Sequence, residues 1–285
     1  MPKKISIIIP ARNEAKSLGN LLPYLKQCHP TSEIILVDDG SIDDTSAIAK
    51  DEGVHVISHP YGMGNGAAIK TGARVAKGNI LVFMDADGQH NPKDIERLLE
   101  KLDEGYDMVV GARDKKSQAS VGRLAANTLY NHFASFMVNH NVEDLTSGFR
   151  AVRADKFREF LHLLPNGFSY PTTSTMAFFR AGYPVAYIPI KASKREGKSH
   201  IKPFKDGIRF FLIIFKIGTL YSPLKIFFPT AIFFFTVGLG YYFYTYASMG
   251  RFTNMGTMLL ITALLVFLIG LVSEQITSLT YKNNE

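Results

Sequence analysis

Residues 80–90 read ILVFMDADGQH, a short apolar run that passes directly into two aspartates separated by one alanine. A run of this length with no alternation of polar residues is typical of a strand that is buried on both faces. Similar runs recur through the first half of the chain and predict further strands. The expected strands are residues 5–9, 33–37, 54–58, 80–84 and 108–110.

Segments with helical patterns separate these runs. Residues 17–27, 45–52, 67–76 and 92–104 have the pattern of helices. Strands that alternate with helices indicate an α/β domain, in which a parallel sheet has helices on both faces. In such sheets, ligands bind beyond the carboxyl ends of the strands.

Polar motifs follow four of the expected strands. The motifs are Pro10-Ala11-Arg12-Asn13-Glu14, Asp38-Asp39-Gly40-Ser41, Asp85-Ala86-Asp87-Gly88-Gln89-His90 and Gly111-Ala112-Arg113. Any one of them would be unremarkable as a loop. Because the carboxyl ends of parallel strands lie at one edge of the sheet, the four together predict a binding site there.

The motif after the fourth strand predicts a metal site. Asp85 and Asp87 are two positions apart, which places both carboxylates on one side of an extended chain. Oxygen ligands suit Mg²⁺ or Mn²⁺, and Gln89 can add a carbonyl oxygen. Aspartates in this place can instead cap the next helix, but Asn91 followed by Pro92 already supplies such a start.

Asp38 and Asp39 end the second strand, where a carboxylate can accept hydrogen bonds from a ribose or a base. The glycine segment of residues 62–66, GMGNG, opens a helix, and its backbone amides could approach a phosphate. It lacks the lysine and hydroxyl residue of a P-loop and does not follow the first strand, as a dinucleotide fingerprint does. The aspartates therefore predict nucleotide contacts, and the glycine segment is a weaker candidate.

Residues 144–150 read DLTSGFR and join an acid, two hydroxyls, a glycine and an arginine. Arg113, Arg150 and Arg195 could converge on phosphate oxygens, which the guanidinium group binds bidentately. Surface salt bridges are the alternative for any one of these arginines. As a set beside carboxylates, they favour a polyphosphate ligand.

The chain continues into two long uncharged stretches, residues 226–250 and 252–273, each long enough to cross a bilayer as a helix. Buried core helices are the alternative. Before them, residues 203–225 mix basic and aromatic residues, which predicts an amphipathic helix in the headgroup plane, with a packed helix of a soluble domain as the alternative. Arg251 is the one charge between the spans, and lysines flank their other ends. The positive-inside rule therefore places the large domain and both termini in the cytoplasm.

Charge and cysteine content narrow the class of protein. The formal net charge is +7, but the basic residues gather before the first span and do not alternate with stacking aromatics. This favours anionic lipid or phosphate partners over nucleic acid. Cys28 is the single cysteine, which excludes an internal disulfide and fits a reducing compartment.

These motifs in combination resemble glycosyltransferase family 2, and within it the polyprenyl-phosphate glycosyltransferases typified by dolichyl-phosphate mannose synthase. The resemblance covers residues 4–202. It implies a GT-A fold, which is a Rossmann-like domain for nucleotide-diphospho-sugars, and inverting transfer of a sugar from a UDP- or GDP-sugar to a polyprenyl phosphate. The expected domains are a catalytic domain at 1–202, an interfacial segment at 203–225 and a two-helix membrane anchor with a short tail at 226–285.

The resemblance also implies roles for individual residues. The residues expected to bind Mg²⁺ or Mn²⁺ are Asp85, Asp87 and Gln89. The residues expected to contact the nucleotide are Pro10, Arg12, Glu14, Val37, Asp38, Asp39, Asp85 and Ala86. The residues expected to contact the acceptor phosphate are Arg113, Ser147, Arg150, Arg195 and Ser199. Those expected to act in catalysis are Asp87, Arg113 and Arg150.

Met63 departs from the family pattern, because related sequences often carry lysine there, so the resemblance does not extend to a diphosphate contact by that loop. The alternatives are a membrane-tethered family 2 transferase with a non-lipid acceptor and a catalytically silent protein of the membrane surface. The sequence leaves open the sugar, the base, the lipid length and the oligomeric state. Gly238 and Gly240 are compatible with pairing of two copies through the spans.

Overall fold

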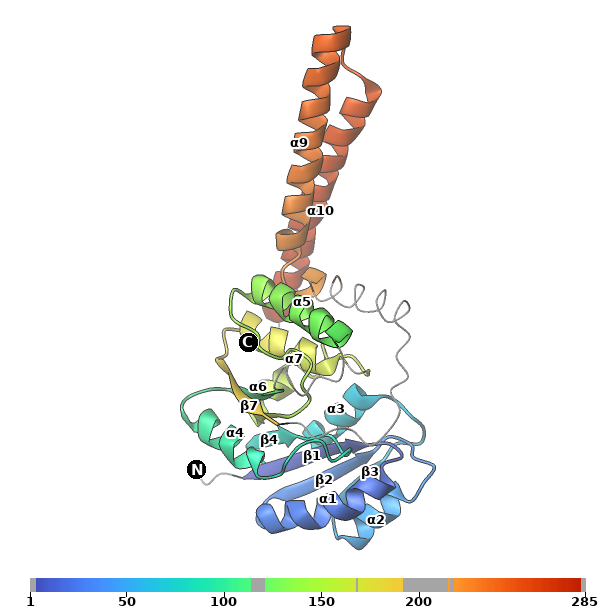
Figure 1. Ribbon diagram of the computed structural model, residues 1–285, viewed down its shortest axis with the longest axis vertical. Coiled ribbons are helices and arrows are strands. Elements are labelled where there is room, and N and C mark those ends of the chain that lie inside the picture. The colour runs from blue at the N-terminus through green and yellow to red at the C-terminus, as the bar shows by residue number, and fades with distance from the viewer. Residues whose placement is uncertain (1–3, 114–120, 168, 192–214, 216–217, 283–285) are drawn as a thin grey trace. The chain divides into compact units, whose positions relative to one another are not determined.

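The computed structural model describes residues 4–113, 121–167, 169–191, 215 and 218–282. The chain divides into two compact units, Met1–Ile201 and Lys202–Glu285. The first unit is an α/β domain and the second contains a pair of long helices (Figure 1).

The described residues of the first unit form a seven-stranded sheet in the order β3-β2-β1-β4-β6-β5-β7. The strands are β1 (Ile5–Ala11), β2 (Glu33–Asp38), β3 (His55–Ser58), β4 (Ile80–Phe83), β5 (Met108–Arg113), β6 (Arg150–Arg153) and β7 (Val185–Ile190). The helices are α1 (Ala15–Cys28), α2 (Thr45–Asp51), α3 (Asn65–Val75), α4 (Asp94–Asp103), α5 (Val121–Val138), α6 (Ala154–Glu159) and α7 (Tyr170–Arg180). Every strand and helix expected in the first half of the chain is present.

Side chains of a strand alternate between the two faces of the sheet, and both faces of this sheet are buried. Ile7 and Ile9 of β1 join one core cluster with leucines of α1 and α4. Ile8 points to the opposite face, where a Cβ on Gly72 of α3 would collide with its side chain. All three isoleucines are fully buried. This burial confirms the expectation drawn from the unbroken apolar runs.

The five expected strands run parallel to one another, as predicted, but the sheet also contains β6, an antiparallel strand that was not expected. β6 pairs antiparallel with both β4 and β5, and its first residue, Arg150, lies opposite Phe83 and Val110. β5 ends at the sheet edge at which β6 begins, so the chain re-enters the sheet from that edge and the new strand must run backward. This reversal brings Gly148, just before β6, to the Asp85 carboxylate that follows β4.

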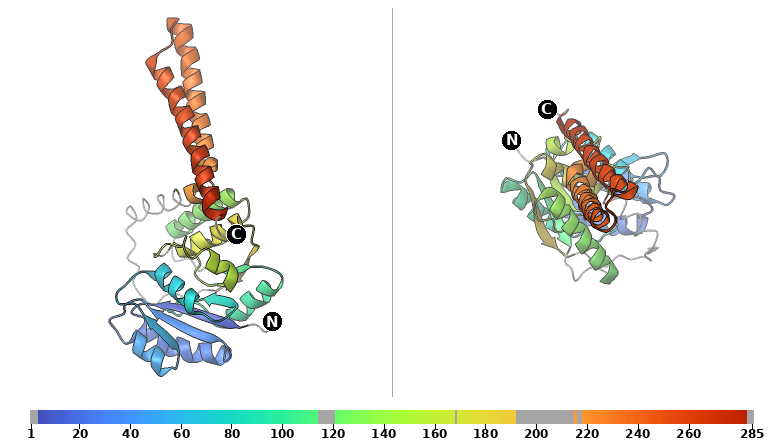
Figure 2. Two further views of the ribbon diagram at one scale, coloured as in Figure 1. Left: turned by 180° about the vertical axis from the view of Figure 1, so that it is seen from behind. Right: turned by 90° about the horizontal axis from the view of Figure 1, so that it is seen from above.

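The described part of the second unit holds two long helices, α9 (Pro223–Met249) and α10 (Asn254–Lys282), which pack side by side as a hairpin (Figure 2). Each is long and apolar enough to span a membrane. Gly250 ends α9 in the left-handed conformation, with a φ of 64°. Most of the expected interfacial segment, residues 203–225, lies outside the described residues.

The open end of the hairpin is closed by a side chain of the second helix. The Leu224 N–H, in the first turn of α9, donates a hydrogen bond to Glu274 Oε2 of α10 at 3.2 Å. Ser222, the residue before α9, makes no capping hydrogen bond with its side chain. Glu274 therefore satisfies one of the backbone amides that the start of a helix leaves without a partner in the helix.

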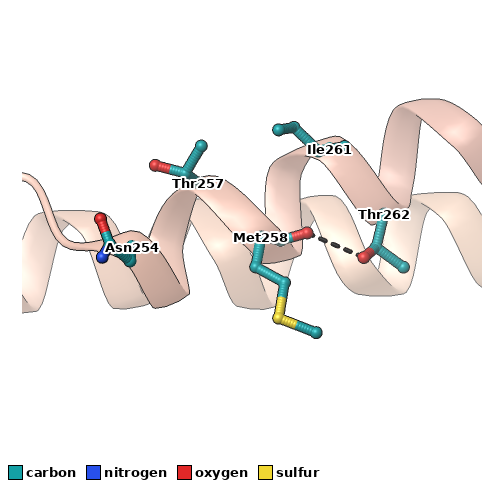
Figure 3. Close-up of a pocket in the computed structure, with 5 residues that line it drawn as sticks. All are labelled: Asn254, Thr257, Met258, Ile261 and Thr262. Carbon is teal, nitrogen blue, oxygen red and sulfur yellow. Dashed lines mark hydrogen bonds between the residues drawn. The ribbon is translucent and has the colours of Figure 1, made fainter.

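An open hollow lies along α10 (Figure 3). It is lined by Asn254, Thr257, Met258, Ile261 and Thr262. The Thr262 hydroxyl donates to the Met258 carbonyl of its own helix at 2.8 Å. None of these lining side chains is titratable, so the hollow offers no group for acid or base chemistry.

Candidate active site

The loops after β1 and β2 are joined by hydrogen bonds between short side chains and backbone amides. Asn13 adopts a left-handed φ of 56°. Its Oδ1 accepts a hydrogen bond from the Ile42 N–H at 2.9 Å, and its own N–H donates to Ser41 Oγ at 2.9 Å. The Glu14 N–H donates to Thr45 Oγ1 at 2.9 Å. These bonds hold the first two polar motifs together at the sheet edge.

Pro10 and Glu14 also shape the first of these loops. Pro10 lies opposite Val37 in the parallel ladder of β1 and β2. Glu14 Oε2 accepts a hydrogen bond from Ser17 Oγ at 3.2 Å, and its carbonyl accepts from the Leu18 N–H, so it organises the start of α1. A nucleotide contact stays a prediction for Pro10 and for Glu14.

Asp39 supports the glycine segment that precedes α3. Its Oδ1 accepts a hydrogen bond from the Met63 N–H and its Oδ2 from the Gly64 N–H, both at 2.8 Å. The His59 Nδ1 lies 2.8 Å from Oδ1. Burial alone would raise the pKa of Asp39, but these hydrogen bonds outweigh it and lower the pKa. The two amides are thus engaged by a carboxylate, which leaves them poorly placed for the phosphate contact considered from the sequence.

Other residues expected to contact the nucleotide lie at the ends of β1, β2 and β4. The exposed Arg12 places its guanidinium against Gly62, where a Cβ would collide with it. Asp38 is buried and its Oδ1 accepts a backbone hydrogen bond within its own loop at 3.0 Å. Val37 and Ala86 are buried, so only their backbone atoms could face a ligand.

The paired aspartates follow β4 as expected. A Cβ on Gly148 would come within 3.1 Å of Asp85 Oδ2 and 3.4 Å of Oδ1, and within 3.2 Å of the Tyr170 hydroxyl. A side chain at position 148 would therefore press on the Asp85 carboxylate. Asp87 Oδ1 accepts a hydrogen bond from the Gln89 N–H at 3.2 Å, which ties the turn together.

These residues fit a hard divalent cation. Asp85 and Asp87 offer carboxylate oxygens, Gln89 offers an amide oxygen, and the space at Gly148 accommodates the first carboxylate. In the part of the chain that the structure describes, no group of three His, Cys, Asp or Glu side chains could hold a metal by itself. Mg²⁺ or Mn²⁺ would therefore take further ligands from substrate phosphates and water.

Arg113 ends β5 and is fixed by Asp144. Its Nε donates to Asp144 Oδ2 at 2.8 Å and its Nη2 to Oδ1 at 2.9 Å, and Nη2 also donates to Thr146 Oγ1 at 2.6 Å. Burial would lower the pKa of Arg113, but the hydrogen bonds and charge of Asp144, together with the charge of Asp85, raise it. The guanidinium is thus held as a cation within the field of Asp85.

Arg150 lies inside the domain, which differs from the sequence-based expectation. Its side chain is fully buried, and the guanidinium donates to the carbonyls of Ser147 and Pro171, the latter at 3.0 Å, and to Ser174 Oγ at 2.8 Å. Ser147 is also buried and its Oγ donates to the Gly111 carbonyl of β5 at 2.6 Å. In this structure both residues hold the loop of residues 144–149, and a direct contact of Arg150 or Ser147 with an acceptor phosphate stays a prediction.

Two expected phosphate contacts, Arg195 and Ser199, lie outside the described residues. Three residues of the site were not assigned from the sequence: Asp144, which anchors Arg113, and Tyr170 and His90, which border Asp85. Asp144 could have been found from its place at the head of the DLTSGFR motif. Tyr170 comes from α7, far along the chain, and its sequence context carries no signal of a site.

Comparison with known sequences decides the family. Residues 6–161 match the family model described as Glycosyl transferase family 2. The chain belongs to glycosyl transferase family 2. A second match, over residues 222–279, is to the GtrB C-terminal hairpin, which coincides with α9 and most of α10 of this family 2 transferase.

Several relatives of this family 2 transferase are named for transfer to polyprenyl phosphates. It is 31% identical to a polyprenol monophosphomannose synthase of Mycolicibacterium smegmatis, over 67% of this chain and 77% of the relative. It is 32% identical to an undecaprenyl-phosphate mannosyltransferase of Micrococcus luteus, over 68% of this chain and 85% of the relative. An uncharacterized protein of Methanocaldococcus jannaschii, MJ1222, is 37% identical over 75% and 93% of the two chains.

Solved structures agree with the GT-A-like fold. A glucosyl-3-phosphoglycerate synthase from Mycobacterium tuberculosis, crystallised with Mn²⁺, UDP and glucosyl-3-phosphoglycerate, superimposes with a TM-score of 0.60. The match has 20% sequence identity and covers 75% of this chain and 78% of the other. At this identity, the likeness establishes the fold of the family 2 transferase and nothing finer.

Proposed function

We propose that this glycosyltransferase moves a sugar, with inversion, from a UDP- or GDP-sugar to a polyprenyl phosphate at the cytoplasmic surface of a membrane. The observation that carries the proposal is that Asp85, after β4, and Arg113, at the end of β5, lie at one edge of the sheet, on an enzyme whose relatives are named for transfer to polyprenyl phosphates. Paired carboxylates suit a metal and a diphosphate, and a fixed guanidinium suits a second phosphate.

The donor would lie across the first three loops and the metal site. Asp85, Asp87 and Gln89 would hold Mg²⁺ or Mn²⁺, which supplies positive charge for the diphosphate leaving group. Arg12, exposed beside Gly62, can reach phosphate or ribose oxygens. A protein of the same fold was crystallised with Mn²⁺ and UDP, so this fold is compatible with such a donor.

The acceptor requires positioning more than activation. A phosphate monoester has a second pKa of about 6, so a lipid monophosphate is largely dianionic at neutral pH and needs no general base. The main obstacle is repulsion between this dianion and the donor diphosphate. Arg113, held in place by Asp144, would neutralise part of this charge, and Arg195 and Ser199 would assist.

The membrane hairpin supports a cytoplasmic active site. Arg251 is the charged residue in the short turn between α9 and α10, and Lys225 and Lys282 lie at the other ends of these helices. By the positive-inside rule, the turn would face outward. A cysteine placed at position 251 in a Cys28→Ser background should react with an impermeant thiol reagent in intact cells. Reaction only after the cells are opened would reverse the orientation.

The test of the proposed function is a transfer assay with detergent-purified full chain. UDP- and GDP-sugars would be screened with Mg²⁺ or Mn²⁺, with and without a short polyprenyl phosphate. We expect label in the lipid fraction, its loss with EDTA, and no turnover by Asp87→Ala. The matched control is Asp51→Asn, an exposed acid at the end of α2, which should retain activity.

Two outcomes of this assay would contradict the proposal. Full activity of Asp87→Ala would remove the metal assignment. Label that reaches a soluble or protein acceptor, and never a lipid, would favour the alternative of a membrane-tethered transferase with a non-lipid acceptor.

A further inference from the structure

His90 is placed to act on Asp85, although it lies outside the set of expected ligands. Its side chain is 5% exposed, and its Nε2 lies 3.8 Å from Asp85 Oδ2. Its Nδ1 is buried and has no hydrogen-bond partner among the described residues. Of the two ring nitrogens, Nε2 is therefore the one that lies near a charged group, the Asp85 carboxylate.

The ring of His90 is held in a fixed plane. It stacks on Phe149, with ring centroids 4.8 Å apart and planes 10° apart. Phe149 is itself fully buried, and its carbonyl accepts a hydrogen bond from the Gly111 N–H of β5 at 2.9 Å. Two residues further on, the Pro92 carbonyl lies 2.9 Å from the ring Nε2 of His29, at the end of α1. Both ends of this short segment are thus anchored.

Two neighbours lie close to the Asp85 carboxylate. A Cβ on Gly148 would fall 3.1 Å from Oδ2, with the Tyr170 hydroxyl 3.2 Å from the same point. The Nε2 of His90 lies 3.8 Å from Oδ2. An imidazole with its proton on Nε2 would attract the near carboxylate oxygen and restrict rotation of the Asp85 side chain.

We infer that His90 is a positioning residue, which orients the Asp85 carboxylate for the divalent cation through its Nε2–H. The inference rests on the proposed metal role of Asp85 and Asp87. The distance of 3.8 Å is longer than a hydrogen bond, but such contacts commonly shorten when the ligand binds. Partners that hydrogen-bond a ligating carboxylate typically change metal affinity by about 10- to 100-fold when they are removed.

The experiment is a Mn²⁺ titration of the detergent-purified full chain, followed by the electron paramagnetic resonance signal of free Mn²⁺, with UDP and separately with GDP present. His90→Phe keeps a ring that can stack on Phe149 but has no N–H. His90→Gln places an amide nitrogen near the position of Nε2, and His90→Asn places one near Nδ1. Thermal melting of each variant controls for folding.

We expect His90→Phe and His90→Asn to bind Mn²⁺ about 10- to 100-fold more weakly than the natural protein, and His90→Gln to recover most of the affinity. Equal weakening in all three variants, or wild-type affinity in a folded His90→Phe, would overturn the inference. Asp87→Ala separates the two proposals. If Asp87→Ala loses Mn²⁺ binding and His90→Phe keeps it, the metal site stands and only the inference about His90 fails. If the natural protein and Asp87→Ala bind Mn²⁺ equally well, or if neither binds it, the metal site and the inference fail together.

Discussion

Loops 10–14 and 38–45 are joined by short polar side chains that bond backbone amides near the surface, whereas loop 144–150 is held by two arginines. In the first pair, Asn13 and Ser41 exchange neutral hydrogen bonds with the opposite loop. In the second, Arg113 pairs with the buried Asp144, and Arg150 donates to carbonyl and hydroxyl oxygens in the interior. One sheet edge is thus built by two kinds of chemistry.

The difference matters for how each loop responds to change. A neutral hydrogen bond contributes about 1 kcal/mol net, because water replaces it in the unfolded chain. A buried charge that loses its partners is far more destabilising, since no water can replace them. Loss of Arg150 or Asp144 should therefore destabilise the domain strongly, while loss of one neutral hydrogen bond between loops 10–14 and 38–45 should destabilise it only slightly.

The largest effect is expected at Arg150. Arg150→Ala would leave the carbonyls of Ser147 and Pro171 without these donors and open a cavity, which should destabilise the first unit by about 3–5 kcal/mol. Denaturant unfolding of the detergent-solubilised chain measures this loss of stability. Arg150→Lys, which keeps the charge and part of the volume, should have a stability between those of the natural protein and Arg150→Ala. If the stability of Arg150→Ala is unchanged and the KM for the acceptor rises, Arg150 contacts the phosphate and its assignment to the interior is wrong.

A smaller loss is expected at Asp144. Asp144→Asn keeps the shape but removes the negative charge that holds Arg113, and hydrogen bonds to charged groups contribute about 1.5–3 kcal/mol each. We expect a loss of stability in that range and a higher KM for the acceptor, because the guanidinium is no longer fixed. Thr146→Val is the matched control, since it removes a hydroxyl that accepts from the guanidinium and donates to Asp144, but leaves both charges of the ion pair in place. Equal effects of the two variants would argue against the ion pair as the fixing element.

Asn13 tests the neutral side of the comparison. Asn13→Gly removes the acceptor for the Ile42 N–H but tolerates the positive φ, so it should cost about 1 kcal/mol. Asn13→Ala adds the strain of a left-handed residue, about 1–2 kcal/mol more. The unfolding midpoint should be highest for the natural protein, lower for Asn13→Gly and lowest for Asn13→Ala. A glycine variant as weak as the alanine variant would show that the hydrogen bond dominates and the φ does not.

The smallest effect is expected from acid. Hydrogen bonds and charge hold the pKa of Asp144 below its ordinary value in spite of burial, and the same holds for Asp39. A lowered folded pKa stabilises the fold above the unfolded value of about 3.9, and this contribution is lost as the pH falls through the folded pKa. Melting temperatures should therefore drop below about pH 4. Asp144→Asn should show a shallower drop, because one contributing group is gone.

The sequence predicted the first half of the domain well because its signals are local. Unbroken apolar runs and the motifs that follow them placed β1 to β5 and brought Asp85 and Asp87 to one edge. β6 was missed because a four-residue strand with an arginine at each end has no apolar pattern. The burial of Arg150 follows from that strand, whose first residue pairs inside the sheet with Phe83. Long-range pairing of this kind leaves no trace in local composition.

The hydrogen bond from Leu224 to Glu274 has a consequence for how the hairpin is made. Its two partners are separated by 50 positions in the chain, so the amide at the start of α9 leaves the ribosome well before the carboxylate of α10. During synthesis the first turn of α9 is therefore made before the side chain that accepts its hydrogen bond. This bond can form only when α10 lies beside α9, so the closed hairpin requires both helices.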